Sequence, residues 1–81
     1  MEPRHRHEVR IRFGKHLAYL RTEQGLSLRE LASQCDVDYS DINKYEHGEK
    51  DLQLTTIVDL AIGLGVEPAA LLGFSFDFLD T

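Results

Sequence analysis

The stretch DVDYSDINKYEHG, residues 36–48, carries the side chains best suited to reading a nucleic-acid base. Asparagine can bond adenine at two points, lysine can donate to guanine, serine can bond any base, and an aromatic ring can contact a thymine methyl. The side chains of these types are Tyr39, Ser40, Asn43 and Lys44. Phosphate should repel the four acids of the same stretch, which are Asp36, Asp38, Asp41 and Glu46. The neighbouring elements must therefore decide which of these side chains face outward.

A first helix is predicted over residues 8–24. Its apolar positions follow one helix face at spacings of four, four and three: Val9, Phe13, Leu17 and Leu20. Gly14 is expected to weaken this helix slightly. Gly25 is expected to end it in the left-handed cap conformation. Residues 1–7 are polar and contain Pro3, so we expect a mobile basic arm there.

Two further short helices are predicted on either side of a tight turn. Ser27 starts the first of them, because SLRE is a capping box. In this motif the Ser27 hydroxyl accepts a hydrogen bond from a backbone N–H, and the Glu30 side chain reaches back to the backbone N–H of Ser27. Asp38 is expected to cap the second, and Asp41 lies in its first turn, where acids complement the helix dipole. Two short helices joined by a tight turn, the second with a polar outer face, form a helix-turn-helix pattern.

The C-terminal third predicts two more helices and a tail. LTTIVDLAIGLG is apolar at helical spacing, and Pro68 in VEPAALLG suits the first turn of a short fifth helix. In the tail, residues 74–81, three phenylalanines alternate with polar residues, which is strand periodicity: Phe74, Phe76 and Phe78. A strand needs a partner, and residues 9–13 (VRIRF) also alternate, so strand pairing within or between chains is the alternative to a helix there.

Length and composition indicate one small domain with one core. The chain has 81 residues, of which 42% are hydrophobic, and a chain this short often needs dimerisation or regular helix packing for stability. Its single cysteine, Cys35, excludes an internal disulfide and fits a reducing compartment. There is no apolar run long enough for a membrane span and no signal-peptide pattern, so a cytoplasmic protein without a membrane partner is expected.

Charge is distributed unevenly along the chain. The net charge is −5, but residues 1–21 carry six basic against two acidic side chains, whereas residues 22–81 carry three against twelve. A local basic face can attract phosphate even when the whole molecule is acidic. Arg4 and Arg6 of the expected arm could enter a minor groove, as arms of DNA-binding domains do.

The spaced elements LR at 20–21, GLS at 25–27, ELA at 30–32, YEHG at 45–48 and LGV at 64–66 resemble the lambda-repressor-like helix-turn-helix family, which includes phage repressors, Cro and XRE-type regulators. The resemblance covers residues 11–72. It implies an all-α fold of five helices over residues 8–73, in which helices two and three form the helix-turn-helix. It also implies dimers that bind two DNA half-sites with helix three in the major groove.

The resemblance assigns roles to individual residues. Tyr39, Ser40, Asn43 and Lys44 match base-facing positions, and Ser27 and Leu28 match phosphate-contacting ones, although Leu28 offers only its backbone N–H. His47 and Lys50 lie where a loop would meet the DNA backbone. Glu46 is expected to pair with Arg21. Asp41 could accept a hydrogen bond from cytosine or could repel DNA.

The sequence thus predicts a homodimeric, sequence-specific regulator of transcription, either a stand-alone repressor or the controller of a restriction-modification or mobile-element operon. The alternative is a protein-interaction module of the same fold, such as an antitoxin that masks a partner protein. The tail could supply a dimerisation patch, made of Phe74, Phe76, Phe78 and Leu79. We expect no enzyme and no cofactor, since no triad or phosphate loop is visible, and no metal site, since His5 and His7 lack further ligands.

Overall fold

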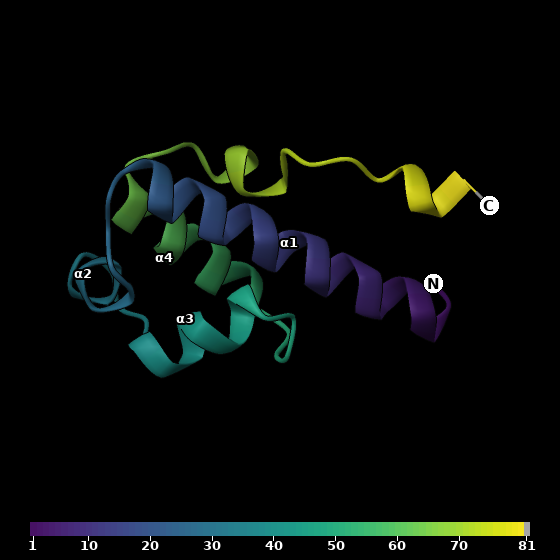
Figure 1. The fold of residues 1–81 in the computed structure, drawn as a ribbon, viewed down its shortest axis with the longest axis horizontal. Coiled ribbons are helices and arrows are strands. Elements are labelled where there is room, and N and C mark those ends of the chain that lie inside the picture. The colour runs from purple at the N-terminus through teal and green to yellow at the C-terminus, as the bar shows by residue number, and fades with distance from the viewer. Residues whose placement is uncertain (81) are drawn as a thin grey trace.

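The computed structural model describes residues 1–80, and within them every regular element is helical. The elements are α1 (Pro3–Glu23), α2 (Leu28–Ser33), α3 (Tyr39–Glu46), α4 (Leu54–Leu64) and the 3-10 helices η1 (Pro68–Leu72) and η2 (Asp77–Asp80). The C-terminal half of α1 lies over the other helices and its N-terminal half extends beyond them, while the C-terminal segment returns along α1 on the side away from α3 (Figure 1). No helix of the described residues is long and apolar enough to cross a membrane.

The core lies where five elements meet. The largest fully buried side chains come one from each of α1, α2, α3, α4 and η1: Leu17, Leu31, Ile42, Leu60 and Leu71. Each buried leucine or isoleucine contributes about 1.5–3 kcal/mol relative to exposure. Because α3 inserts Ile42 into this cluster, the core fixes the orientation of α3 relative to the other helices.

The start of α2 and the end of α1 are set by local sequence, as predicted. Ser27 caps α2 by accepting a hydrogen bond from the Glu30 N–H at 3.0 Å, and Glu30 accepts from the Ser27 N–H at 2.9 Å. The second bond holds the pKa of the Glu30 carboxyl below its ordinary value. Gly25 and Gly48, which follow α1 and α3, have φ angles of 70° and 69°, a left-handed conformation that costs glycine little.

The first helix begins at Pro3 and not at residue 8, so residues 3–7 are helical where an arm was predicted over residues 1–7. Pro3 occupies the first turn, where its missing N–H and fixed φ suit a helix start. The extension is also supported by the C-terminal segment, since the ring of His5 lies 6.3 Å from that of Phe78. A proline that starts the helix and a contact with a distant segment together favour helix over arm.

The predictions for the C-terminal third need two corrections. The fifth helix is η1, a 3-10 helix of five residues, with Pro68 in its first turn. The predicted strand is absent among residues 1–80, and residues 9–13, its suggested partner, belong to α1. The phenylalanines of the tail instead form a row of rings along α1, with centroids 4.6 Å apart for Phe74 and Phe76 and 6.2 Å apart for Phe76 and Phe78.

Candidate nucleic-acid interface

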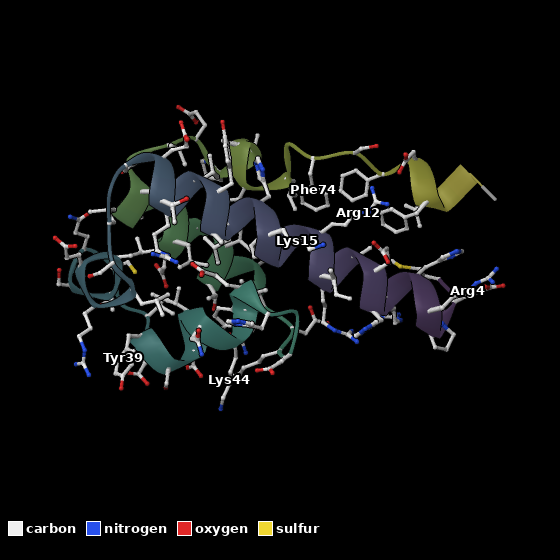
Figure 2. The ribbon with its side chains drawn as sticks, in the orientation of Figure 1. Arg4, Arg12, Lys15, Tyr39, Lys44 and Phe74 are labelled. Atoms are coloured by element: carbon white, nitrogen blue, oxygen red, sulfur yellow. The ribbon has the colours of Figure 1, made fainter. Side chains whose placement is uncertain are left out.

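The four side chains predicted to face bases share the outer side of α3. Ile42 and Tyr45 are buried, whereas Ser40, Asn43 and Lys44 are exposed and Tyr39 retains 39% of its surface. Figure 2 shows Tyr39 and Lys44 projecting from the outer side of α3. Lys44 makes no ion pair within residues 1–80. The helix therefore presents hydrogen-bonding groups to a ligand while its inner side joins the core.

At the start of α2, the side chains of the two residues predicted to contact phosphate are engaged within the protein. The Ser27 hydroxyl is engaged in the capping box, and the side chain of Leu28 packs against the core cluster. Leu28 is half-buried and its side chain is apolar, so only its backbone N–H could bond a phosphate. Any contact of this helix start with phosphate would use backbone N–H groups.

Arg29 is a candidate that the sequence analysis missed. Its guanidinium carbon lies 4.3 Å from the centroid of the Tyr39 ring, so α2 and α3 are linked by a cation–π contact at the outer surface. The guanidinium makes no hydrogen bond to a described residue, which leaves its donors open to an anion. A basic residue on the outer side of a short helix was visible in the sequence, but its stacking on a residue ten positions away was not.

Asp41 has an internal partner. Its carboxylate accepts a hydrogen bond from Lys50 Nζ at 2.9 Å, and this bond raises the pKa of Lys50. Lys50 lies in the loop after α3, 5.9 Å from the centroid of the Tyr45 ring. The acid that phosphate should repel is therefore neutralised by a cation that could itself bind phosphate.

Asp38 begins α3 but does not cap it with its side chain, which corrects the prediction. The carboxylate accepts from the Ser40 hydroxyl and makes no bond to a backbone N–H of the first turn. This interaction occupies the proton of Ser40, which leaves the Ser40 oxygen as an acceptor. At the other end of α3, His47 Nδ1 lies 2.7 Å from the backbone oxygen of Asn43.

Glu46 and Arg21 form the predicted ion pair between α3 and α1. Arg21 donates from Nε and Nη2 to the two carboxylate oxygens at 2.6 and 2.9 Å, and from Nη1 to the backbone oxygen of Leu26 at 2.7 Å. The side chain of Arg21 is only 15% exposed and that of Glu46 only 6%. The bond to Glu46 raises the pKa of Arg21. Three of the four acids in residues 36–48 thus have partners inside the protein, and Asp36 lies exposed in the turn.

The apolar patch expected in the tail is divided. Phe74 and Phe78 are half-buried, with the Phe74 ring 5.8 Å from His16 and the Phe78 ring 4.6 Å from the guanidinium carbon of Arg12. Phe76 and Leu79 are 39% and 40% exposed. A good part of the aromatic surface is therefore covered by α1 of the same chain.

Comparison with known proteins agrees with the helix-turn-helix fold. The helix-turn-helix family model matches residues 17–71. The control protein C.BamHI from Bacillus amyloliquefaciens is 31% identical over 68 residues, which are 83% of this chain and 84% of the relative. The control protein C.MunI from Mycoplasma sp. is 33% identical over 60 residues, 73% and 81% of the two chains.

A solved structure of a known protein has a similar fold. The crystal structure of the restriction-modification controller protein C.AhdI from Aeromonas hydrophila matches with a TM-score of 0.73 and 38% identity, over 75% of this chain and 92% of that one. The chain therefore belongs to the XRE-type helix-turn-helix family of DNA-binding transcription regulators.

Proposed function

We propose that the protein is a sequence-specific regulator that binds two operator half-sites as a homodimer, with α3 of each copy in the major groove. The observation that carries this proposal is the outer side of α3, where exposed amide, ammonium, hydroxyl and phenol groups stand opposite a fully buried Ile42. The likeness to control proteins, including a restriction-modification controller, supports a role in regulating a restriction-modification operon.

Individual roles follow from the chemistry of the exposed groups. Asn43 would bond adenine through two atoms, and Lys44 would donate to guanine O6 and N7. Ser40, whose proton is held by Asp38, would accept a hydrogen bond from a base. Tyr39 would contact a thymine methyl or a phosphate oxygen.

Phosphate contacts would flank the bases on both sides of α3. Arg29 would bind a phosphate beside the start of α3, where stacking on Tyr39 restricts its conformations. His47 would meet the backbone beyond its end, Lys50 would do so once released from Asp41, and Ser27 and Leu28 would contribute backbone N–H groups. Such contacts fix the register of the protein on DNA without reading sequence.

The dimer surface that we propose is an apolar row on α4. Leu54, Val58 and Ile62 repeat every four residues and are 76%, 37% and 68% exposed. A row of this kind on a small domain indicates an interaction site. Leu54 directly follows the loop after α3, so pairing two copies through this row keeps their α3 helices near one another. Phe74 and Phe78 of the tail pack on α1, whereas Phe76 and Leu79 stay 39% and 40% exposed and keep the tail as a second candidate surface.

The experiment that tests the function is footprinting on the DNA upstream of the protein's own gene. We expect protection of an inverted repeat. Asn43→Ala and Lys44→Ala should each weaken binding by about 1–3 kcal/mol, the cost of removing one bidentate pairing with a base. Lys15→Ala, which removes an exposed charge from α1, is the matched control and should leave the footprint unchanged. Retention of the wild-type footprint by both α3 variants would contradict the recognition assignment.

Salt dependence separates DNA reading from a protein-interaction role of the same fold. A DNA-binding protein loses affinity steeply with salt, by roughly 0.9 powers of salt concentration per phosphate neutralised. A complete absence of DNA binding at low salt would favour the protein-interaction module, with the α4 row as the surface for its partner.

Asp41→Asn is expected to tighten binding to random-sequence DNA and to steepen its salt dependence by about one power, because Lys50 becomes free to neutralise a phosphate. Both quantities can be read from fluorescence anisotropy titrations at several salt concentrations. Asp36→Asn removes the same charge from the exposed turn without releasing a lysine and serves as the control. Equal effects of the two substitutions would show that Asp41 acts only through net charge.

A further inference from the structure

The N-terminal half of α1 has two unlike sides, and the C-terminal segment covers one of them. On this side Arg12 donates from Nε to Glu8 at 2.9 Å and from Nη1 to Asp77 at 2.9 Å, and its guanidinium also contacts the Phe78 ring. The ring of His5 lies against Phe78 as well. The charge of Arg12 is thus satisfied within the protein, and the tail holds this part of α1 in place.

The other side of the same helix faces the loop that follows α3. Gly48 packs on α1 so closely that a Cβ at this position would lie 3.1 Å from the Cα of Ile11. Farther toward the N-terminus, Arg6 and Arg10 line a shallow hollow together with Val9 and Asp51 of that loop. Figure 1 shows α3 and the C-terminal segment on opposite sides of α1. Arg6 and Arg10 therefore lie on the side of the recognition helix.

The charges on this side are not satisfied within the protein. Neither Arg6 nor Arg10 makes an ion pair or a hydrogen bond through its side chain with another residue of the described part of the chain. Arg4, in contrast, pairs with Glu2 at 2.8 Å. Two guanidinium groups one helical turn apart, with Asp51 as the acid beside them, favour an anion with several acceptor oxygens, and guanidinium forks suit phosphate geometry.

A minor-groove role, expected for Arg4 and Arg6 on a flexible arm, does not suit this conformation. An α-helix with its side chains is about 10–12 Å wide, whereas the minor groove of B-DNA is about 6 Å wide. We therefore propose that the N-terminal half of α1 is a second nucleic-acid contact surface, which uses Arg6 and Arg10 to bind backbone phosphates that flank the site read by α3. This inference rests on the proposed function and extends the interface beyond the helix-turn-helix.

The test is the salt dependence of binding to a long random-sequence duplex, measured by anisotropy for the full chain and for the double variant Arg6→Ala, Arg10→Ala. We expect the slope of log affinity against log salt to fall by about two, one for each phosphate that an arginine no longer neutralises. Lys15→Ala is the matched control, because Lys15 lies beside Phe74 on the tail side of α1. The Lys15→Ala variant should show the wild-type slope. The double variant Arg6→Lys, Arg10→Lys should also retain the wild-type slope, because it keeps both charges.

Each outcome decides for or against the inference. An unchanged slope in the double variant, or an equal fall with Lys15→Ala, overturns the inference while the proposed function stands. Absence of salt-dependent DNA binding by the wild type overturns the proposed function and this inference with it. If circular dichroism shows that the alanine pair reduces the helix content, Arg6→Gln, Arg10→Gln gives the same test, since glutamine keeps high helix propensity.

Discussion

Replacing Glu46 with alanine is expected to lower the free energy of unfolding by about 3–5 kcal/mol, because it leaves a largely buried guanidinium without its counter-ion. Arg21 meets both oxygens of Glu46 and is 15% exposed. The carboxylate raises the pKa of Arg21, and arginine stays charged at any pH at which the protein is folded, so deprotonation cannot relieve the unpaired charge. Arg21 also binds the Leu26 oxygen, so the destabilisation extends to the α1–α2 turn.

Urea denaturation followed by circular dichroism measures this effect. Glu23→Ala removes an exposed acid near the end of α1 and should change stability by less than about 0.5 kcal/mol. Arg21→Lys should also destabilise, since lysine cannot reproduce the two-point contact. A destabilisation below about 1 kcal/mol for Glu46→Ala would mean that the pair behaves like an exposed surface bridge, which contributes little.

The parts of the fold that were predicted correctly depend on short-range sequence. Ser27 and Glu30 are three positions apart, and their capping box forms within one helical turn whatever surrounds it. The polar outer face predicted for the second helix of the helix-turn-helix is that of α3, whose buried residues Ile42 and Tyr45 lie three positions apart. The ion pair of Arg21 with Glu46 spans 25 positions, and only the family resemblance predicts it.

The features that were missed depend on contacts between distant segments. The contact of Arg29 with Tyr39 and the bond of Lys50 to Asp41 require the folded arrangement of α2, α3 and the following loop. The alternating phenylalanines of the tail indicated a strand, but rings can also be covered by stacking along a helix, which needs no backbone pairing. The apolar residues of α4 follow helical spacing, but spacing alone does not show which of them meet another helix. It therefore did not reveal that Leu54 is exposed.

Gly14 illustrates how a distant contact reverses an expectation from local sequence. In an exposed helix, glycine to alanine would stabilise by about 1 kcal/mol, which is why local sequence predicts only a slight weakening of the first helix by Gly14. In the structure a Cβ at this position would overlap the Tyr45 carbonyl oxygen and would lie 2.7 Å from the carbonyl carbon of Glu46. These are backbone atoms at the end of α3, so they cannot rotate away, and α1 and α3 would have to separate.

Gly14→Ala is therefore expected to destabilise the protein by about 1–3 kcal/mol, the usual cost of overpacking, in spite of the better helix propensity of alanine. The same separation would strain the bond between Arg21 and Glu46 and tilt α3, so binding to DNA should weaken in molecules that remain folded. Thermal denaturation and anisotropy titration measure the two effects, and Lys15→Ala, on the adjacent exposed residue, is the control for both. A stabilised Gly14→Ala variant would show that α1 and α3 can move apart at little cost. The orientation of α3 would then depend on the buried core and on the pair of Arg21 with Glu46.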